Sequence, residues 1–233
     1  MQFRPRVRGT LGDVPVSSGQ RLLRFDRSFG ARLVAGADEA GRGSLAGPLV
    51  TAAVLLDYEC LRDHRVRPLA LLNDSKQCSP VQREQLFRAV VGCATKVAIR
   101  VISAHDIDRD GLHRSNLAGL RACLARCAPP AELCLVDGFR LGKEAPEHRA
   151  VVDGDTKSAA IAAASIVAKV VRDLTMRRLD ALYPHYEFSR HVGYITPRHS
   201  SIVRDRGPSA IHRRSFAARC YMDVSADELA EHA

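Results

Sequence analysis

Residues 33–43, LVAGADEAGRG, decide how this chain folds and which chemistry it offers. An apolar run ends in two adjacent acids, Asp38 and Glu39, and a Gly-Arg-Gly turn follows at once. A second apolar run comes after the turn, so the pattern predicts two strands joined by a tight connection. Carboxylates this close raise each other's pKa unless cations neutralise them. We therefore expect a divalent metal here, with a phosphate as the ligand shared by the metal and the arginine.

Length and charge limit the class of protein. The chain has 233 residues, 46% of them hydrophobic, which suits one α/β domain with an extension or at most two small domains. A net charge of +9 favours a polyanionic partner, nucleic acid first and a membrane surface second. The longest apolar run, near residues 46–56, is too short to span a bilayer, and the Arg-rich start lacks the apolar segment of a signal peptide. We expect no membrane association.

Cysteine usage points to a reducing compartment. Seven cysteines are scattered along the chain without a CxxC pair. Cys123 and Cys127 share one face of a helical pattern, but no further zinc ligands stand close by, so small buried residues are the better interpretation. Because this usage does not suit a disulfide scaffold, we expect a cytoplasmic protein.

The chain divides into an extension and one compact domain. Residues 1–30 are rich in arginine and include a Gly/Pro/Ser stretch, which predicts a flexible or loosely docked basic arm. Residues 31–233 form the domain. Its apolar patterns predict strands at residues 32–38, 49–57, 95–102, 132–136 and 151–152, and helices at residues 80–91, 113–127 and 156–182. Strands mixed with helices predict an α/β layer fold.

Two further acids stand where predicted strands meet helices. Asp137 follows the apolar run 133–136, and Asp155 precedes a helix of small residues. Alone, Asp155 is well explained as a helix N-cap and Asp137 as a turn residue. With Asp38 and Glu39 they form an all-carboxylate set, and hard oxygen ligands select Mg²⁺ or Mn²⁺ over zinc. Two such ions about 4 Å apart would hold a phosphodiester and activate a water, so the set predicts phosphoryl chemistry.

Several motifs follow one another in a fixed order. They are GADEAGRG at 36–43 with LAGP at 45–48, NDSK at 73–76, VDG at 136–138, GDTKS at 154–158 with AAASIVAKV at 162–170 and Arg172-Asp173, Gly193-Tyr194 with Thr196 and His199, and HRRSF at 212–216. From about Val34 to Phe216 the chain thereby resembles the type 2 ribonuclease H family. The resemblance implies a ribonuclease H-like α/β fold, with a mixed five-stranded sheet flanked by helices and a helical C-terminal part.

The resemblance also implies an activity. Family members are endonucleases that hydrolyse the RNA strand of RNA–DNA hybrids and nick at single ribonucleotides in duplex DNA, leaving 3′-hydroxyl and 5′-phosphate ends. Such hybrids and duplexes are the implied partners, and no obligate protein partner is evident. By motif match, the catalytic and metal-binding acids are Asp38, Glu39, Asp137 and Asp155, which would hold two Mn²⁺ or Mg²⁺ ions.

Substrate contacts follow from the same match. Gly41, Arg42 and Gly43 would contact the 2′-hydroxyl, because a turn without Cβ atoms at its flanks lets backbone groups approach a sugar closely. Tyr194 would stack on the neighbouring deoxyribose. Candidate phosphate contacts are Ser75, Lys76, Lys157 and Ser158, each equally well explained as a solvated surface residue. Asn116 and Lys169 are candidates for supporting the site, and Arg198, Arg204, Arg206, Arg213 and Arg214 predict a basic face for the nucleic-acid backbone.

The chain departs from the family pattern at four positions. Ser44 replaces a proline, Gln77-Cys78 replaces Lys-Leu, and Ile195 replaces the glycine after the motif tyrosine. Because isoleucine disfavours a positive φ, we expect the loop that places Tyr194 to differ.

Two alternatives to the enzyme remain. A catalytically silent hybrid-binding module would share the fold, but the presence of all four acids argues against it. A different nuclease or an integrase would also share the fold, and the Gly-Arg-Gly turn and the tyrosine motif argue against that.

Overall fold

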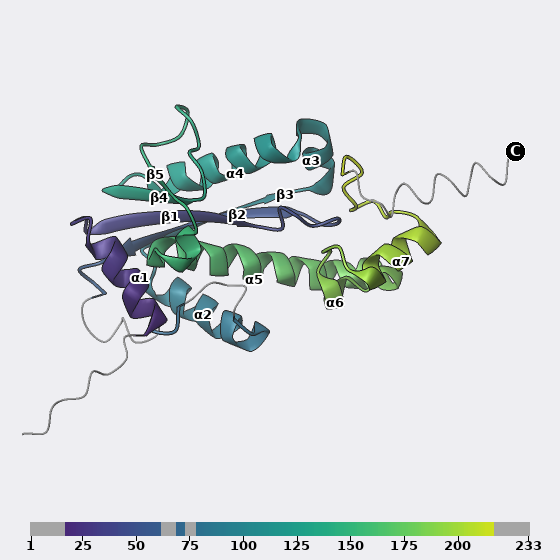
Figure 1. Ribbon diagram of the computed structural model, residues 1–233, viewed down its shortest axis with the longest axis horizontal. Helices are drawn as coiled ribbons and strands as arrows, with labels where there is room; N and C mark the ends of the chain where they lie inside the picture. Colours follow the sequence, from purple (N-terminus) through teal and green to yellow (C-terminus); the bar gives the residue numbers. More distant parts are fainter. Residues whose placement is uncertain (1–16, 62–68, 73–77, 217–233) are drawn as a thin grey trace, which may run out of the picture.

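A computed structural model describes residues 17–61, 69–72 and 78–216 of the chain (Figure 1). Its centre is one mixed sheet with the strand order β3-β2-β1-β4-β5. The strands are β1 (Leu33–Ala40), β2 (Leu49–Asp57), β3 (Lys96–Ile102), β4 (Leu133–Asp137) and β5 (Arg149–Val151). β2 is antiparallel to both β1 and β3, whereas β4 is parallel to β1 and β5 is parallel to β4. The predicted five-stranded mixed sheet is confirmed.

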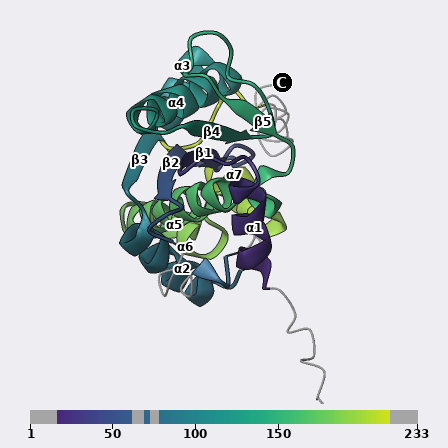
Figure 2. The same ribbon diagram turned by 90° about the vertical axis from the view of Figure 1, so that its left-hand side faces the viewer.

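Helices cover both faces of this sheet (Figures 1 and 2). On one face lie α3 (Ala104–Asp110) and α4 (Leu112–Cys127), and on the other lies α5 (Ala159–Leu182), with α1 (Ser18–Arg27) and α2 (Pro80–Cys93) packed on it. Two short 3₁₀ helices, η2 (Gly154–Thr156) and η3 (Pro184–Tyr186), flank α5. The predicted helical C-terminal part consists of α6 (Phe188–His191) and α7 (Pro197–Arg206). None of the helices in the described segments is long and hydrophobic enough to cross a membrane.

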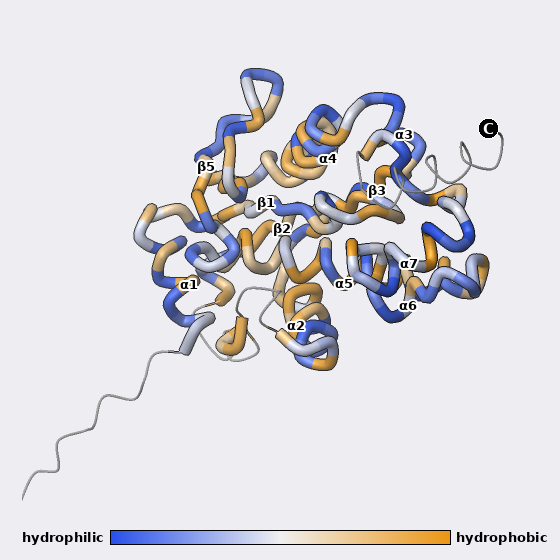
Figure 3. The backbone as a smooth tube through the Cα atoms, turned by 45° about the vertical axis from the view of Figure 1, so that its right-hand side comes forward, coloured by the Kyte–Doolittle hydropathy of each residue, from blue (hydrophilic) through white to orange (hydrophobic). Residues whose placement is uncertain are grey.

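Hydrophobic residues fill both interfaces between sheet and helices. Val34 and Val54 face α5, whereas Ala35 and Ala53 face α4, as the two-residue period of a strand requires. Figure 3 shows the hydrophobic segments gathered around the sheet and α5. The cysteine pair predicted to be buried on one helix face does lie in the cluster under α4.

Small residues bring α5 very close to β1. Residues 159–164 are fully buried, and five of the six are alanines. A Cβ atom at Gly36 would lie 2.1 Å from the carbonyl carbon of Ala160, so only a glycine in the strand permits this approach. The close contact places the start of α5 against Gly36, which is two residues before Asp38 in β1.

The prediction of a loosely docked arm is wrong for the part of residues 1–30 that the structure describes. A capping box at Ser17 starts α1. Leu22 and Leu23 are buried, and Asp26 accepts hydrogen bonds from Tyr58 and from the first turn of α5. The arginines suggested a solvated tail, but they alternate with a buried face; the residues before Ser17 lie outside the described ones.

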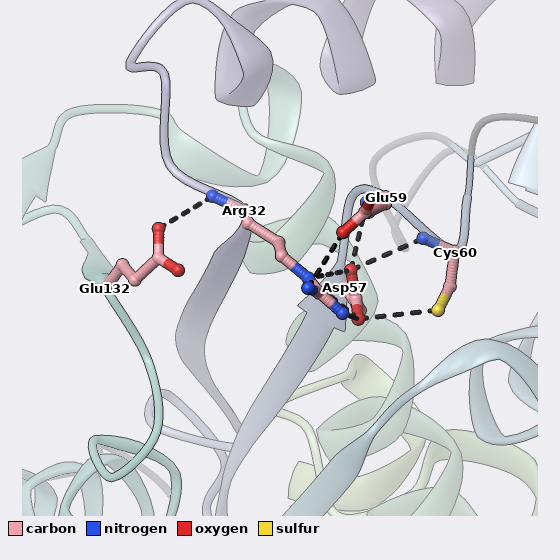
Figure 4. Close-up of polar contacts among 5 residues, drawn as sticks. All are labelled: Arg32, Asp57, Glu59, Cys60 and Glu132. Carbon is pink, nitrogen blue, oxygen red and sulfur yellow. Dashed lines mark hydrogen bonds and ion pairs between the residues drawn. The ribbon is translucent and has the colours of Figure 1, made fainter.

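An ion-pair cluster closes the end of β1 that lies far from the acids (Figure 4). Arg32 Nη2 lies 2.9 Å from an Asp57 carboxylate oxygen, and Arg32 Nη1 lies 2.8 Å from Glu59. Asp57 also accepts hydrogen bonds from the backbone N–H groups of Glu59 and Cys60, while the Arg32 N–H donates to Glu132. The Arg32 guanidinium holds the pKa of Asp57 well below its usual range.

We predict that Asp57→Asn lowers the free energy of unfolding at pH 7 by about 1 kcal/mol, since the bond network is charge-assisted but partly exposed. The folded-state pKa of Asp57 is depressed, so its contribution is present above about pH 4 and is lost as pH falls below that value. Urea unfolding at a series of pH values from 7 downward measures the free energy of unfolding of wild type and variant. The difference between the two should become smaller below about pH 4. The control Glu84→Gln, in an exposed pair with Arg88, should change little. A difference independent of pH would contradict the assignment.

Candidate active site

The sheet brings three of the four predicted acids to one place. Asp38 and Glu39 lie near the end of β1, and Asp137 is the last residue of β4. β1 and β4 are parallel and pair Ala37 with Val136, so the next residues, Asp38 and Asp137, stand side by side. Asp155 lies in η2, directly before α5.

Asp38 occupies an unfavourable position for a lone anion. Its side chain is buried, and burial, followed by the charges of Glu39 and Asp137, raises its pKa well above the usual range. The Ser165 hydroxyl and the Glu39 N–H, at 2.7 Å, donate hydrogen bonds to it and offset part of this cost. A buried carboxyl surrounded by carboxylates fits a divalent cation.

The other acids are held by groups of the chain itself. Asp137 Oδ1 accepts a hydrogen bond from the Gly154 N–H at 2.7 Å, and Glu39 lies 3.7 Å from Arg42 Nη1. Asp155 is buried. Within the described ranges, no three acidic, histidine or cysteine side chains converge closely enough to hold a metal ion as they stand. The donor set has the chemistry for Mg²⁺ or Mn²⁺ and the sheet assembles it, but the side chains do not form a closed ligand shell.

The two glycines of the turn differ in what they are needed for. Gly41 has φ +90°, and a Cβ atom there would lie 2.0 Å from the Arg172 Nε atom. Gly43 has nothing within 4 Å of the position of a Cβ atom. Internal packing and backbone conformation therefore require the first glycine, whereas the second leaves open space on the surface. Between them the half-exposed Arg42 guanidinium lies over the Phe139 ring, 5.4 Å from its centroid.

Two fully buried arginines brace this turn. Arg172, in α5, donates to the carbonyl oxygens of Pro48, Ala46 and Val192 at 2.9, 3.1 and 2.9 Å. Arg213 donates to the carbonyls of Gly47 and Arg42, each at 3.0 Å. The prediction of Arg213 as part of an exposed basic face is therefore wrong, because its charge is used inside the protein. Arg204, Arg206 and Arg214 are exposed, and Arg198 pairs with Glu187.

Tyr194 stands on a loop that is tied to the same region. Its backbone forms an isolated bridge with Ser44, and two cations lie near its ring, Lys169 Nζ at 5.0 Å and Arg172 Cζ at 5.1 Å from the centroid. The loop has positive φ at Val192 and Gly193, and Ile195 is not among such residues. The physical reason for expecting a different loop therefore does not apply.

The remaining candidates are more dispersed. Ser158 is fully buried and its hydroxyl caps α5, which argues against a phosphate contact. Lys157 is exposed, and its Nζ donates to the Val152 carbonyl at 2.7 Å. Asn116 is buried in α4, and neither atom of its amide has a hydrogen-bond partner among the described residues. Ser75 and Lys76 lie outside the described residues, as do Gln77 and the rest of that motif.

Sequence reasoning missed the supporting roles of Ser165, Phe139 and Arg172. Ser165 and Arg172 lie seven residues apart on α5, which places them on one face, and apart from Lys169 the residues between them are apolar. That pattern was a usable signal for a buried polar contact. Phe139 follows the Asp137-Gly138 turn, and nothing local indicates that it lies under Arg42.

Comparisons with known proteins agree on one family. Residues 35–219 match the family model described as Ribonuclease HII. The Ribonuclease HII of Geobacillus kaustophilus is 41% identical over 201 residues, which cover 85% of this chain and 74% of that protein. Among solved structures, RNase HII of Archaeoglobus fulgidus in its complex with PCNA has a TM-score of 0.68 at 25% identity, covering 80% of this chain and 96% of that chain. Bst-RNase HIII in complex with Mn²⁺ has a TM-score of 0.63 at 21% identity, covering 86% and 71%, and supports the fold alone.

We predict opposite outcomes for alanine at the two turn glycines. Gly41→Ala should lower the free energy of unfolding by about 2 kcal/mol, because it forces a side chain into a positive φ and against Arg172. Gly43→Ala, the matched control, should stay within about 0.5 kcal/mol of wild type. Urea unfolding of the three proteins checks this, and equal losses would show that Arg172 does not determine the residue at position 41.

Proposed function

Because the chain belongs to the ribonuclease HII family of metal-dependent endonucleases that cleave the RNA strand of RNA–DNA hybrids, we propose a more specific activity for it. The protein nicks duplex DNA at single embedded ribonucleotides, with two divalent ions, and leaves 3′-hydroxyl and 5′-phosphate ends. The observation that carries this proposal is the buried Asp38 carboxyl, which lies among carboxylates and beside the turn of residues 41–43.

The four acids would hold Mg²⁺ or Mn²⁺, because a set made only of carboxylate oxygens selects these hard cations. When bound, two such ions hold the scissile phosphate and lower the pKa of the attacking water. Asp38 would be one of the ligands, because its buried carboxyl is destabilised as an anion by the charges of both Glu39 and Asp137. The Gly154 N–H occupies one oxygen of Asp137 and orients the carboxylate, which leaves the second oxygen to bind.

The turn would recognise the 2′-hydroxyl with its backbone. Arg213 holds the carbonyl of Arg42, and Arg172 fills the space over Gly41, so the turn is braced from inside. The open space at Gly43 lets a sugar approach the main chain closely. A rigid backbone with one open face is what discrimination between ribose and deoxyribose needs, since the two differ by one hydroxyl.

Tyr194 would stack on the deoxyribose next to the ribonucleotide. Its ring already lies against Lys169 and Arg172, and its backbone is joined to Ser44 at the end of the turn. The turn that would contact the 2′-hydroxyl and the tyrosine that would contact the junction are thereby connected to each other. Lys157, Ser75, Lys76 and the exposed arginines of the C-terminal part are the proposed phosphate contacts.

We propose the cytoplasm as the location of the protein, because seven scattered cysteines without a CxxC pair do not suit a disulfide scaffold. The relative from Archaeoglobus fulgidus forms a complex with PCNA. That this chain needs no obligate protein partner stays a prediction.

The decisive test is a duplex DNA with one ribonucleotide, incubated with Mg²⁺ or Mn²⁺ and, separately, with chelator. We expect one nick at the ribonucleotide that depends on metal. The variant Asp137→Asn should lose about 10³-fold or more in rate, because one charged ligand is gone, while hybrid binding measured in Ca²⁺ stays near wild type.

The control for this variant is Asp110→Asn, an exposed carboxylate at the end of α3. Its rate should match wild type. A nick in chelator would contradict the metal mechanism, no nick in any metal would contradict the proposed activity, and normal turnover of Asp137→Asn would remove that residue from the site.

For Tyr194→Ala, we predict a larger loss of rate on a single-ribonucleotide duplex than on a long RNA–DNA hybrid, by roughly tenfold. The ring would contact the deoxyribose only where a ribonucleotide is followed by DNA. Initial rates on the two substrates under the same conditions measure the ratio. Equal losses on both substrates would show that the tyrosine does not read the junction.

A further inference from the structure

Three buried histidines form a cluster beside the loop that carries Tyr194. They are His191 at the end of α6, His199 in α7 and His212 after α7. The rings of His191 and His199 stack with centroids 4.0 Å apart, and Phe188 packs edge-on against both. The proposed chemistry does not use these imidazoles.

Hydrogen bonds determine which ring nitrogen carries each proton. The Ser209 backbone N–H donates to Nδ1 of His212 at 2.9 Å, so the proton of His212 is on Nε2. That Nε2 lies 3.0 Å from Nε2 of His199, which must therefore accept. The proton of His199 is then on Nδ1, which lies 2.9 Å from the carbonyl oxygen of Tyr194.

Starting from the other end of this series of hydrogen bonds, at Tyr194, leads to the same assignment. The Tyr194 carbonyl only accepts, so Nδ1 of His199 must donate to it and Nε2 of His199 must accept from His212. His191 is equally determined, since its Nδ1 accepts from the Gly193 N–H at 3.2 Å and its Nε2 donates to the Tyr186 carbonyl at 2.8 Å. All six ring nitrogens are engaged, so these three side chains offer none to a metal ion.

We propose that the directed relay from Ser209 through His212 and His199 to the Tyr194 carbonyl positions Tyr194 for junction recognition. His199 and His212 are thus positioning residues of the site, and this role rests on the function proposed above for Tyr194. The relay is distinct from the metal site, because it touches only the backbone of the tyrosine.

The loop needs such a restraint because its backbone is strained just before the tyrosine. Val192 is β-branched and has φ +43°, a conformation that such residues rarely adopt. Strain of this kind persists only where the surroundings determine the conformation. Arg172 holds the Val192 carbonyl on one side, His191 holds the Gly193 N–H, and the relay holds the Tyr194 carbonyl on the other side.

The relay requires all three rings to be neutral. Burial lowers the pKa of His199 to about 4 and that of His212 to about 3, and it lowers the pKa of His191 as well. The charged groups that act on them are Arg214, which disfavours a proton on His212, and Glu187 and Asp180, which favour one on His191. An added proton at the contact between His199 and His212 would set two donors against each other, so the relay holds at pH 7.

The first test reads the tautomers of the wild-type protein. Long-range ¹H–¹⁵N correlation spectra of ¹⁵N-labelled protein at pH 7 distinguish protonated from unprotonated ring nitrogens. We expect a protonated Nδ1 for His199 and a protonated Nε2 for His212, with signals assigned by the variants below. The opposite tautomer in either ring, or a charged ring at pH 7, would overturn the proposal.

The second test compares two variants of His199. In His199→Asn the side-chain amide keeps a donor near the position of Nδ1, whereas His199→Leu has none. We expect the ratio of rates on single-ribonucleotide duplex and long hybrid to fall roughly tenfold in His199→Leu, the value of about one hydrogen bond, and to stay within about threefold of wild type in His199→Asn. The control His105→Leu, at an exposed site, should leave the ratio unchanged.

The two tests separate the two proposals. If wild type shows no preference for the junction, the function proposed for Tyr194 fails while the tautomers still test the relay. If wild type prefers the junction and His199→Asn loses the preference as fully as His199→Leu, the relay does not position the tyrosine. If His199→Leu does not fold, the proposal is still tested by the tautomers of the wild-type protein and by the ratio of rates in His199→Asn.

Discussion

The buried guanidinium of Arg172 is the constraint on which the candidate site depends. Taking this charge out of water is costly, and three backbone carbonyls replace the lost hydration. Two of these carbonyls belong to the segment after the Gly-Arg-Gly turn, and the third belongs to Val192. One side chain of α5 thereby connects the turn of β1 with the loop of Tyr194. Gly41 must be a glycine because the guanidinium occupies the place of its Cβ atom.

The alanine-rich start of α5 serves the same arrangement at the other end of the helix. Alanines favour a helix, but their small size matters more here, since it lets the helix touch the backbone of β1 at Gly36. With the helix so close, Ser165 reaches Asp38 and donates to a carboxyl that would otherwise lack a partner from α5. Asp26 of α1 supports the first turn of this helix through the Ala160 N–H at 2.9 Å. The small residues at the start of α5 thus determine both the distance between α5 and β1 and the hydrogen bond from Ser165 to Asp38.

Sequence reasoning succeeded where the signal is local. The predicted helix start at residue 80, the apolar runs that became β1, β2 and β4, and the position of acids at strand ends all depend on a few neighbouring residues. At that helix start the structure has a capping box of Ser79 and Gln82. It failed where a residue's role depends on distant parts of the chain. Arg213 was counted as surface charge and α1 fell in a predicted loosely docked arm, yet Arg213 is buried against the turn at Arg42 and α1 packs on α5. Net charge says nothing about which cations a protein uses inside its own core.

The structure also separates what is rigid from what must adjust. Backbone groups near the turn and the tyrosine loop are fixed by buried arginines, positive-φ glycines and imidazoles. The carboxylates differ, since Glu39 lies near Arg42, Asp137 is bound to the Gly154 N–H, and no closed ligand shell exists among the described residues. Like charges repel until a cation joins them, so a scaffold that held them together without metal would lose stability. It is therefore physically consistent that the parts proposed to read sugar shape are preorganised by hydrogen bonds from the chain itself, whereas the acids would come together only when a metal binds.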